Sequence, residues 1–432
     1  MESAQGHFDA LIGGSSCTKS HCDLSRGVVS NDRTGTVALH LRQPDPELLD
    51  KLALPLAQLV PPGVPMTKPA PLGVPGTGPY VVQSFKPEPR HAQRGVGWLV
   101  LRRNPRFREW FAAAQPDGYP DKIVLTYKNA RSAQVTAVEH GTSDLMRSPP
   151  SQRMDELETR YAAQIHVFLA AQTFGIFLNT RLPPFDSPAA RKAFNYAIDR
   201  SKAISGFGGV GGATVTCQIL PVGMPAYRPY CPYTRNRTRA GSWKGPDLAR
   251  ARKLIDASGT RGQKVVLWTG SKPFQLALGH LALATLVQLG YRALLKIVAG
   301  QPPDYFGKVF DFRTRAQAGF IAWGADYPTA SNFFAPQFSC SAAPPASQDS
   351  INAAELCSPQ LDKAVHRALS EQTTDKAAAA NARWAAIDRM VTDIAPWAPI
   401  VNGRIVVFVS PRVGNVQANQ ALGFLLDQIW VK

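Results

Sequence analysis

The chain has 432 residues, of which 44% are hydrophobic and 18% charged, which excludes a disordered or fibrous polypeptide and predicts more than one domain. Its net charge is +17, an excess that would suit nucleic acid, acidic lipids or cell-wall polymers. The basic residues are scattered, however, and the densest run, Arg235–Lys244, has the composition of a loop. We therefore interpret the charge as a solvated surface and expect no nucleic-acid partner.

The sequence shows neither a membrane span nor an export signal. The most apolar window, Ala277–Leu295, contains His280, Gln288 and Arg292, which favours a buried helix followed by a strand. The first residues, Met1–Ser16, lack a basic region followed by an apolar one. We expect a globular chain with no signal peptide in the chain as given.

The first part of the chain predicts a strand at Thr36–Arg42 and then a short helix that Asp45 and Pro46 open. A Pro-rich connector, Val60–Gly76, marks a domain boundary. Three strands and a helix should follow as an α/β unit, within Gly76–Pro87, Val96–Phe107, Asp121–Asn129 and Ser132–Gly141.

The middle of the chain carries the sharpest local signals. Gly175–Asn179 predicts a strand, after which Ser187 can cap a helix with Pro188 in its first turn. Asp247 and Gly259 delimit a second helix. The remaining elements alternate between strand and helix, with a β-α-β unit whose strands should be parallel, and are expected at Lys264–Gly270, Phe274–Leu289, Tyr291–Val298, Ser358–Gln372, Lys376–Ile394 and Pro399–Pro411.

The six cysteines fall into local pairs, although several connectivities are possible. We expect the disulfides Cys17–Cys22, Cys217–Cys231 and Cys340–Cys357, because each would close a loop rich in Pro, Ser or Gly. Neither a C-x-x-C pattern nor a histidine spacing completes a zinc site, so we expect no metal. An even, paired set favours an oxidising, extracytoplasmic compartment.

Motifs for catalysis are weak. Gly206–Gly211 matches G-x-G-x-x-G, but it follows a predicted helix rather than a strand, so a Gly-rich turn is the better interpretation. The chain has no P-loop, no H-E-x-x-H and no G-x-S-x-G, and its histidines are dispersed. We expect no enzyme activity and no cofactor.

One stretch, Ile321–Phe334 ("IAWGADYPTASNFF"), places the carboxylate of Asp326 among aromatic residues. A carboxylate beside aromatic rings suits a cationic ligand group through charge-assisted hydrogen bonds and cation–π attraction. Asp also commonly caps a turn, here before Pro328. The residues alone leave both interpretations open.

The order of these motifs resembles family 5 of the extracytoplasmic solute-binding proteins of ABC transporters. The similarity rests on "GTGPYVVQSFKP", "LRRNPRF", "DKIVLTY", "LNTRLPPFDSPAARKAFNYAIDR", "DLARARKLIDASG" and "WGADYPTASNFF", and covers nearly the whole chain. It implies an α/β, two-lobed periplasmic-binding-protein-like (type II) fold with a partial accessory domain. It also implies that Asp326 binds the α-amino group of a peptide, that Trp323 and Tyr327 line the pocket, and that Asn179 lies near the cleft.

The resemblance implies a segment order, with the accessory-domain remnant at 1–72, part of lobe I at 73–175, lobe II at 176–400 and a return to lobe I at 401–432. The expected function is the capture of a peptide or other small solute by a monomer that delivers it to the permease subunits of an ABC transporter. The alternative is a ligand-sensing module of a larger regulator. Relative to the family, the chain is expected to be truncated at its beginning, and Thr329, Ala330 and Ser331 replace a common D-P-D pattern.

Overall fold

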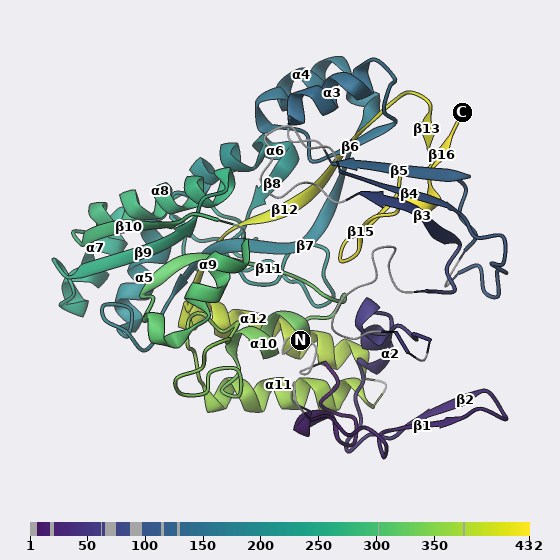
Figure 1. Ribbon diagram of the computed structural model, residues 1–432. Coiled ribbons are helices and arrows are strands. Elements are labelled where there is room, and N and C mark those ends of the chain that lie inside the picture. Colours follow the sequence, from purple (N-terminus) through teal and green to yellow (C-terminus); the bar gives the residue numbers. More distant parts are fainter. Residues whose placement is uncertain are drawn as a thin grey trace. The chain divides into compact units, whose positions relative to one another are not determined.

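The computed structural model describes residues 7–17, 21–61, 63–64, 75–86, 97–113, 116–127, 130–300, 302–374 and 376–432. The chain forms two compact units (Figure 1). Unit 1 comprises the described residues up to Leu56 together with Ala171–Phe207 and Ala213–Gly403, and unit 2 comprises Ala57–Ala170, Gly208–Gly212 and Arg404–Lys432. The four-segment assignment to lobes and accessory domain stays a prediction, and the Pro-rich connector lies largely outside the described residues.

Unit 1 contains a mixed sheet that positions the candidate site. Its strands lie in the order β10-β9-β11-β7-β12, with β8 paired to β12. Their bounds are Ile165–Leu178 for β7, Ala213–Val215 for β8, Lys264–Gly270 for β9, Arg292–Val298 for β10, Ala318–Gly324 for β11 and Trp397–Val409 for β12. β11 is parallel to β9 and antiparallel to β7, which places it inside the sheet. The long strands β7 and β12 each continue from unit 1 into unit 2.

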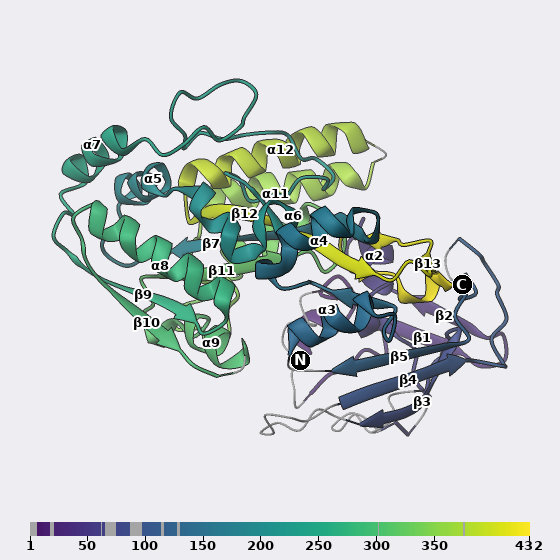
Figure 2. The same cartoon turned by 90° about the horizontal axis from the view of Figure 1, so that it is seen from above.

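Some helices of unit 1 pack on this sheet, and others pack on one another. They are α2 (Leu48–Leu52), α5 (Pro188–Ala197), α7 (Leu248–Ser258), α8 (Pro273–Gln288), α9 (Pro302–Val309), α10 (Ser331–Phe338), α11 (Pro359–Gln372) and α12 (Ala377–Ile394). Helix α8 packs against β9 and β10, and α11 lies along α12 (Figures 1 and 2). The buried aromatic side chains between these elements include Phe177, Phe320, Phe334, Trp384 and Trp397.

Local sequence signals explain several helix ends. Asp247 accepts a hydrogen bond from the Arg250 backbone N–H and Gly259 adopts the left-handed conformation, so α7 begins and ends as predicted. The β-α-β unit is confirmed, because β9 and β10 are parallel and α8 connects them. Two local expectations are wrong in detail: the Ser187 side chain makes no capping bond to α5, and α2 begins after Glu47 rather than at Asp45.

The beginning of unit 1 consists of a hairpin, β1 (Val28–Asn31) with β2 (Thr36–Leu39), followed by α2. The backbone N–H of Glu47 bonds to the Asp45 carboxylate at 3.0 Å, and the Asp45 carboxylate also pairs with Lys51 at 2.8 Å. These bonds hold the turn that leads into α2.

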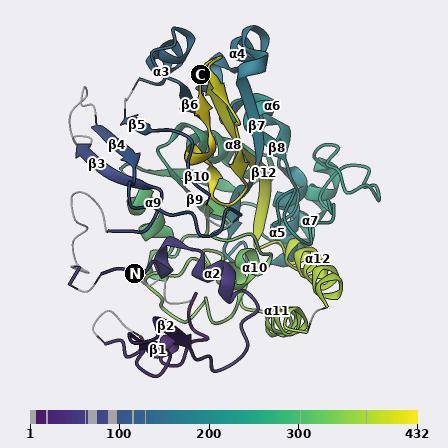
Figure 3. The ribbon, with the colours of Figure 1, turned by 90° about the vertical axis from the view of Figure 1, so that its right-hand side faces the viewer.

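Unit 2 contains an antiparallel sheet β3-β4-β5, formed by Tyr80–Lys86, Gly97–Arg103 and Lys122–Tyr127 (Figures 2 and 3). The other elements include the helices α3 (Arg131–Glu139), α4 (Met154–Arg160) and α6 (Gly209–Gly212) and the strand β6 (Leu145–Arg147). Close to the C-terminus, β13 (Val413–Gly414) pairs with β16 (Trp430–Val431), and β14 (Ala418–Asn419) pairs with β15 (Gly423–Phe424). A core of Val135, Val138, Met146, Leu157 and Phe408 holds α3 and α4 against β6 and β12.

The Gly-rich stretch Gly206–Gly211 is not only a turn, because the short helix α6 (Gly209–Gly212) begins within it. It leads from a 3₁₀ helix (Arg200–Phe207) to β8, whereas a dinucleotide site needs it between a strand and a helix. Among the helices that the structure describes, none is both long and apolar enough to cross a bilayer.

The structure contains the three disulfides expected from the spacing of the cysteines: Cys17–Cys22, Cys217–Cys231 and Cys340–Cys357. All six cysteines are paired. The residues at 18–20, inside the first loop, lie outside the described residues.

Replacing both Cys217 and Cys231 by serine is expected to lower the free energy of unfolding by about 3 kcal/mol, the chain-entropy estimate for a loop of about 15 residues. The two cysteines are 14 residues apart. Urea unfolding of the oxidised proteins, with mass spectrometry to count the remaining disulfides, measures the loss. An unchanged midpoint would show that this bond does not restrict the unfolded chain.

Candidate functional site

The stretch with the aromatic residues and Asp326 forms the connection between β11 and α10. β11 ends at Gly324 and α10 begins at Ser331. Asp326 therefore lies just beyond the end of β11, a strand in the interior of the sheet. We call the connection together with the first turn of α10, Gly324–Asn332, the acidic loop.

The carboxylate of Asp326 is accessible, with 41% of the side chain exposed. Its Oδ2 accepts a hydrogen bond from Asn332 Nδ2 at 3.2 Å, and the Asp326 backbone N–H donates to Asn332 Oδ1 at 2.9 Å. His7 Nε2 lies 3.6 Å from the same Oδ2. Within the described residues, the carboxylate thus meets two side chains rather than a backbone N–H of the following turn, which disfavours the turn-cap interpretation.

The two aromatic residues predicted for the site differ in exposure. Trp323 is partly exposed, and its Nε1 donates to the Asn332 carbonyl oxygen at 2.8 Å. Tyr327 is buried, and its hydroxyl donates to Glu47 Oε2 at 3.4 Å. Burial, together with the charge of Glu47, raises the pKa of Tyr327. Trp323 thus keeps part of its surface exposed, whereas the Tyr327 hydroxyl is already engaged within the protein.

A second carboxylate, Glu47, lies beneath the acidic loop. It is 3% exposed, and it accepts hydrogen bonds from the hydroxyls of Ser331 and Tyr327. Burial raises its pKa, while the Ser331 hydrogen bond and the charge of Lys51 act in the opposite direction. Glu47 therefore joins the segment before α2 to the loop that carries Asp326.

The basic groups nearby are only partly available to these acids. Lys51 pairs with Asp45 at 2.8 Å. Burial lowers the pKa of His7, and the charge of Asp326 offsets this only in part. The ring of His7 lies edge-on to Tyr327, with 5.8 Å between the ring centroids. His7 is thus the described ion-pair partner of Asp326, and it is charged only when its imidazole is protonated.

Asn179 is not brought together with the other predicted site residues. It follows β7 at the end where Leu178 pairs with Ala318, whereas Asp326 follows the opposite end of β11. A strand of this length spans about 20 Å. Asn179 is 1% exposed; its Nδ2 donates to the Ala316 carbonyl and to Glu355, and its Oδ1 accepts from the Arg181 N–H. Its side-chain amide is thus hydrogen-bonded within the protein, and its place beside a ligand stays a prediction.

Sequence reasoning missed Glu47, His7 and Asn332 as parts of this site. Asn332 lay within the quoted stretch, and its amide could have been recognised as a partner for Asp326. Glu47 and His7 come from a distant part of the chain, and no local pattern links them to the loop.

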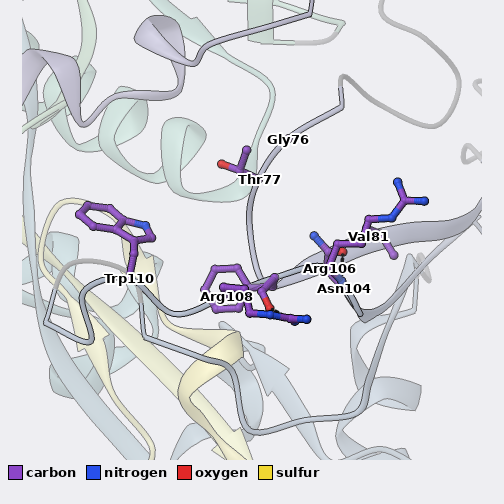
Figure 4. A pocket seen from close by; sticks show the side chains of 8 residues that line it. Gly76, Thr77, Val81, Asn104, Arg106, Arg108 and Trp110 are labelled. Carbon is purple, nitrogen blue, oxygen red and sulfur yellow. Dashed lines mark hydrogen bonds between the residues drawn. The ribbon is translucent and has the colours of Figure 1, made fainter. Parts of the chain in front are cut away.

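A concave surface of different character lies in unit 2. A pocket of about 420 Å³ is lined by the side chains drawn in Figure 4, which include Arg106, Phe107, Arg108 and Trp110. The loop that follows β4 is held in place because the Asn104 backbone N–H donates to the Pro79 carbonyl and its side-chain amide donates to the Gly78 carbonyl. The charged side chains that line this pocket are arginines, so its charge is opposite to that of the acidic loop.

The side chains of the acidic loop have the chemistry to bind a cationic group. An exposed carboxylate, fixed by an amide and flanked by Trp323, can accept charge-assisted hydrogen bonds from an ammonium group. Among the described side chains, no group of three His, Cys, Asp or Glu residues could hold a metal ion.

The chain is similar to known solute-binding proteins. The family model for bacterial extracellular solute-binding proteins, family 5 (middle region), matches residues 15–345. A probable di/tripeptide-binding protein 5 of Pseudomonas aeruginosa is 24% identical over 358 residues, which are 80% of this chain and 59% of that protein. The glutathione-binding protein GsiB of Escherichia coli is 23% identical over 386 residues, 86% of this chain and 67% of that protein. The chain thus spans about three fifths of the first relative.

Solved structures show the same fold. The clavulanic acid biosynthesis oligopeptide binding protein 2 superposes with a TM-score of 0.79 at 23% identity, covering 94% of this chain and 72% of that one. A dipeptide binding protein from Pseudoalteromonas sp. SM9913, solved in complex with Met-Leu, gives a TM-score of 0.72 at 19% identity, covering 100% and 78%. The expected α/β, two-lobed periplasmic-binding-protein-like fold is confirmed. By its family match, the chain belongs to family 5 of the bacterial extracellular solute-binding proteins.

Proposed function

We propose that this chain is the extracytoplasmic solute-binding component of an ABC importer and that it captures a peptide-like solute through the ligand's amino group. The observation that carries the proposal is the exposed carboxylate of Asp326, fixed by Asn332 beside the partly exposed Trp323. A desolvated ammonium would find there both an ionic hydrogen bond and an aromatic face.

Other features agree with this role. Relatives carry names that denote di/tripeptide and glutathione binding. The three disulfides suit an oxidising compartment outside the cytoplasm. The expected partners are the permease subunits of the transporter, which would receive the solute from a monomeric binding protein. Neither a cofactor nor nucleic acid is part of the proposal.

Asp326→Asn is expected to weaken the binding of a peptide with a free amino terminus by roughly 1.5–3 kcal/mol, the range for a hydrogen bond to a charged group. This corresponds to an affinity loss of roughly 10- to 150-fold. Calorimetry with a panel of di- and tripeptides, each with a free and an acetylated amino terminus, measures the effect. Acetylated peptides should bind both proteins with similar affinity, because they carry no ammonium group.

The matched control is Asp256→Asn, which removes an exposed carboxylate of α7 that pairs with Arg261. It should leave peptide affinity unchanged. If Asp326→Asn binds free peptides as well as the unmodified protein does, the role assigned to Asp326 is wrong.

A further inference from the structure

Glu47 is a buried acid that the proposed function does not use. Its two carboxylate oxygens accept hydrogen bonds from Ser331 and Tyr327, which lie 284 and 280 residues later in the chain. Both partners belong to the acidic loop: Tyr327 directly follows Asp326, and Ser331 lies four residues later. One carboxylate therefore fixes the loop at two points.

The contact continues from Ser331 to Asp326 through the next residue. Asn332 follows Ser331 in the first turn of α10, and its amide group holds both the backbone N–H and the carboxylate of Asp326. Trp323 Nε1 donates to the Asn332 carbonyl at 2.8 Å. The orientation of Asp326 thus depends on Asn332. The position of Asn332 in turn depends on Ser331, the preceding residue, which is hydrogen-bonded to Glu47.

The charge of Glu47 makes a purely space-filling role a poor explanation. A buried carboxylate is costly unless hydrogen bonds compensate it, and an apolar residue would often stabilise such a place equally well. Lys51 is close enough to act on Glu47 through its charge, but its ammonium is bonded to Asp45. The hydroxyls of the acidic loop are the described hydrogen-bonding partners of the Glu47 carboxylate. A satisfied buried network of this kind favours one arrangement of the groups that form it.

We propose that Glu47 is a positioning residue for ligand binding: by holding Ser331 and Tyr327, it keeps the Asp326 carboxylate in the orientation that recognises an amino group. This inference rests on the proposed function, because it assigns Glu47 to the recognition of the same ammonium. Glu47 does not itself contact the ligand; it acts through the loop.

The test compares the same peptide with a free and with an acetylated amino terminus. The measured quantity is the dissociation constant of the acetylated peptide divided by that of the free peptide, which we call the amino-terminus ratio. In Glu47→Ala the ratio should fall by about tenfold, because a misoriented Asp326 loses most of its charge-assisted hydrogen bond. Affinity for the acetylated peptide should change by less than about twofold, since the pocket is otherwise intact. Equal weakening of both peptides would overturn the proposal, because it would show only a structural role.

Two milder variants keep the test decisive if Glu47→Ala does not fold, which thermal melting would reveal. Glu47→Gln retains one oxygen that can accept from a hydroxyl. Its ratio should therefore lie between that of Glu47→Ala and that of the unmodified protein. Ser331→Ala removes one anchor and should lower the ratio less than Glu47→Ala does. An unchanged ratio in both folded variants would also overturn the proposal. The matched control, Asp32→Asn in the β1–β2 turn of the same segment, should leave the ratio unchanged.

The double variant Glu47→Ala/Asp326→Asn separates this inference from the proposed function. If Glu47 acts through Asp326, the double variant should show the same ratio as Asp326→Asn alone. If Asp326→Asn leaves the ratio unchanged, the proposed function itself fails. If Asp326→Asn lowers the ratio to about one while folded Glu47→Ala keeps the ratio of the unmodified protein, only the positioning role fails.

Discussion

Replacing Trp384 by alanine is expected to lower the free energy of unfolding by about 3–5 kcal/mol, the usual cost of truncating a large buried aromatic side chain. Trp384 lies in α12 and is 1% exposed. Its ring stacks on Phe334, with 6.0 Å between the centroids and 9° between the planes. Its Nε1 donates to Gln372 Oε1 at 3.0 Å, which ties α12 to the end of α11. Alanine would leave a cavity between three helices and an unpaired amide.

The same change should reach the acidic loop, because Phe334 belongs to α10, the helix that begins with Ser331 and Asn332. We expect weaker peptide binding in addition to the lower stability. Urea unfolding and calorimetry on the same preparation measure both effects. Trp384→Phe is the matched control, since it keeps an aromatic ring on Phe334 and loses the hydrogen bond, at about 1 kcal/mol. A loss for Trp384→Ala no larger than that for Trp384→Phe would contradict the cavity argument.

The parts of the fold that could be predicted from the sequence are those set by near neighbours along the chain. Asp247 and Gly259 delimit α7 because a cap and a left-handed residue act within one turn. The β-α-β unit of β9, α8 and β10 follows from periodicity and from the short connections. The order of motifs identified the family and the loop that carries Asp326.

The rest of the site depends on contacts that no local pattern encodes. Glu47 meets Ser331 across 284 residues of sequence, so only the folded chain reveals the pair. The resemblance implies that Asn179 lies near the cleft, which stays a prediction. The structure shows that β7, the strand before Asn179, is antiparallel to β11, so Asn179 and Asp326 follow opposite ends of this strand pair. Strand direction within a sheet is a tertiary property, and the sequence of Gly175–Asn179 alone does not specify it.

Asp388 is expected to make the stability of the protein depend on pH. It lies in α12, fully buried, and burial raises the pKa of its carboxyl group to about 7. The carboxylate accepts from Gln218 Nε2 at 2.6 Å and from the backbone N–H groups of Ile219 and Leu220 at 3.1 and 3.3 Å. Arg389 and Tyr227 are the other titratable groups that interact with it, and neither forms an ion pair with it among the described contacts.

This carboxylate holds a segment that is bonded to β7 and, through Thr173, to β12. The Ile219 carbonyl accepts from Thr173 Oγ1 of β7 at 2.8 Å, and Thr173 Oγ1 in turn accepts from Asn402 Nδ2 of β12 at 2.8 Å. Gln218 also accepts from the Tyr230 N–H, next to the disulfide cysteine Cys231. A change in the charge of Asp388 therefore acts on a network that includes β7, β12 and the disulfide loop.

The direction of the pH effect follows from the raised pKa. In the unfolded chain Asp388 should titrate near its ordinary value of 3.8, whereas the folded protein keeps the proton up to about pH 7. Between these values the folded state binds more protons, so the contribution of Asp388 to stability is largest at low pH and is lost as the pH rises toward 7. The whole window corresponds to about 4 kcal/mol, and the part between pH 5 and pH 8 to about 2–3 kcal/mol.

Asp388→Asn should remove this dependence, because the amide does not titrate. The amide nitrogen would face Gln218 Nε2 donor to donor or face the two backbone N–H groups, so the variant should be less stable than the unmodified protein at pH 5. At pH 8 the unmodified protein bears a buried charge, and the gap between the two should shrink or reverse by about 2–3 kcal/mol. Urea unfolding of both proteins at pH 5, 6.5 and 8 measures this gap, and subtracting the curves cancels the other titrating groups. Parallel stability curves over this range would show that Asp388 does not take up its proton on folding.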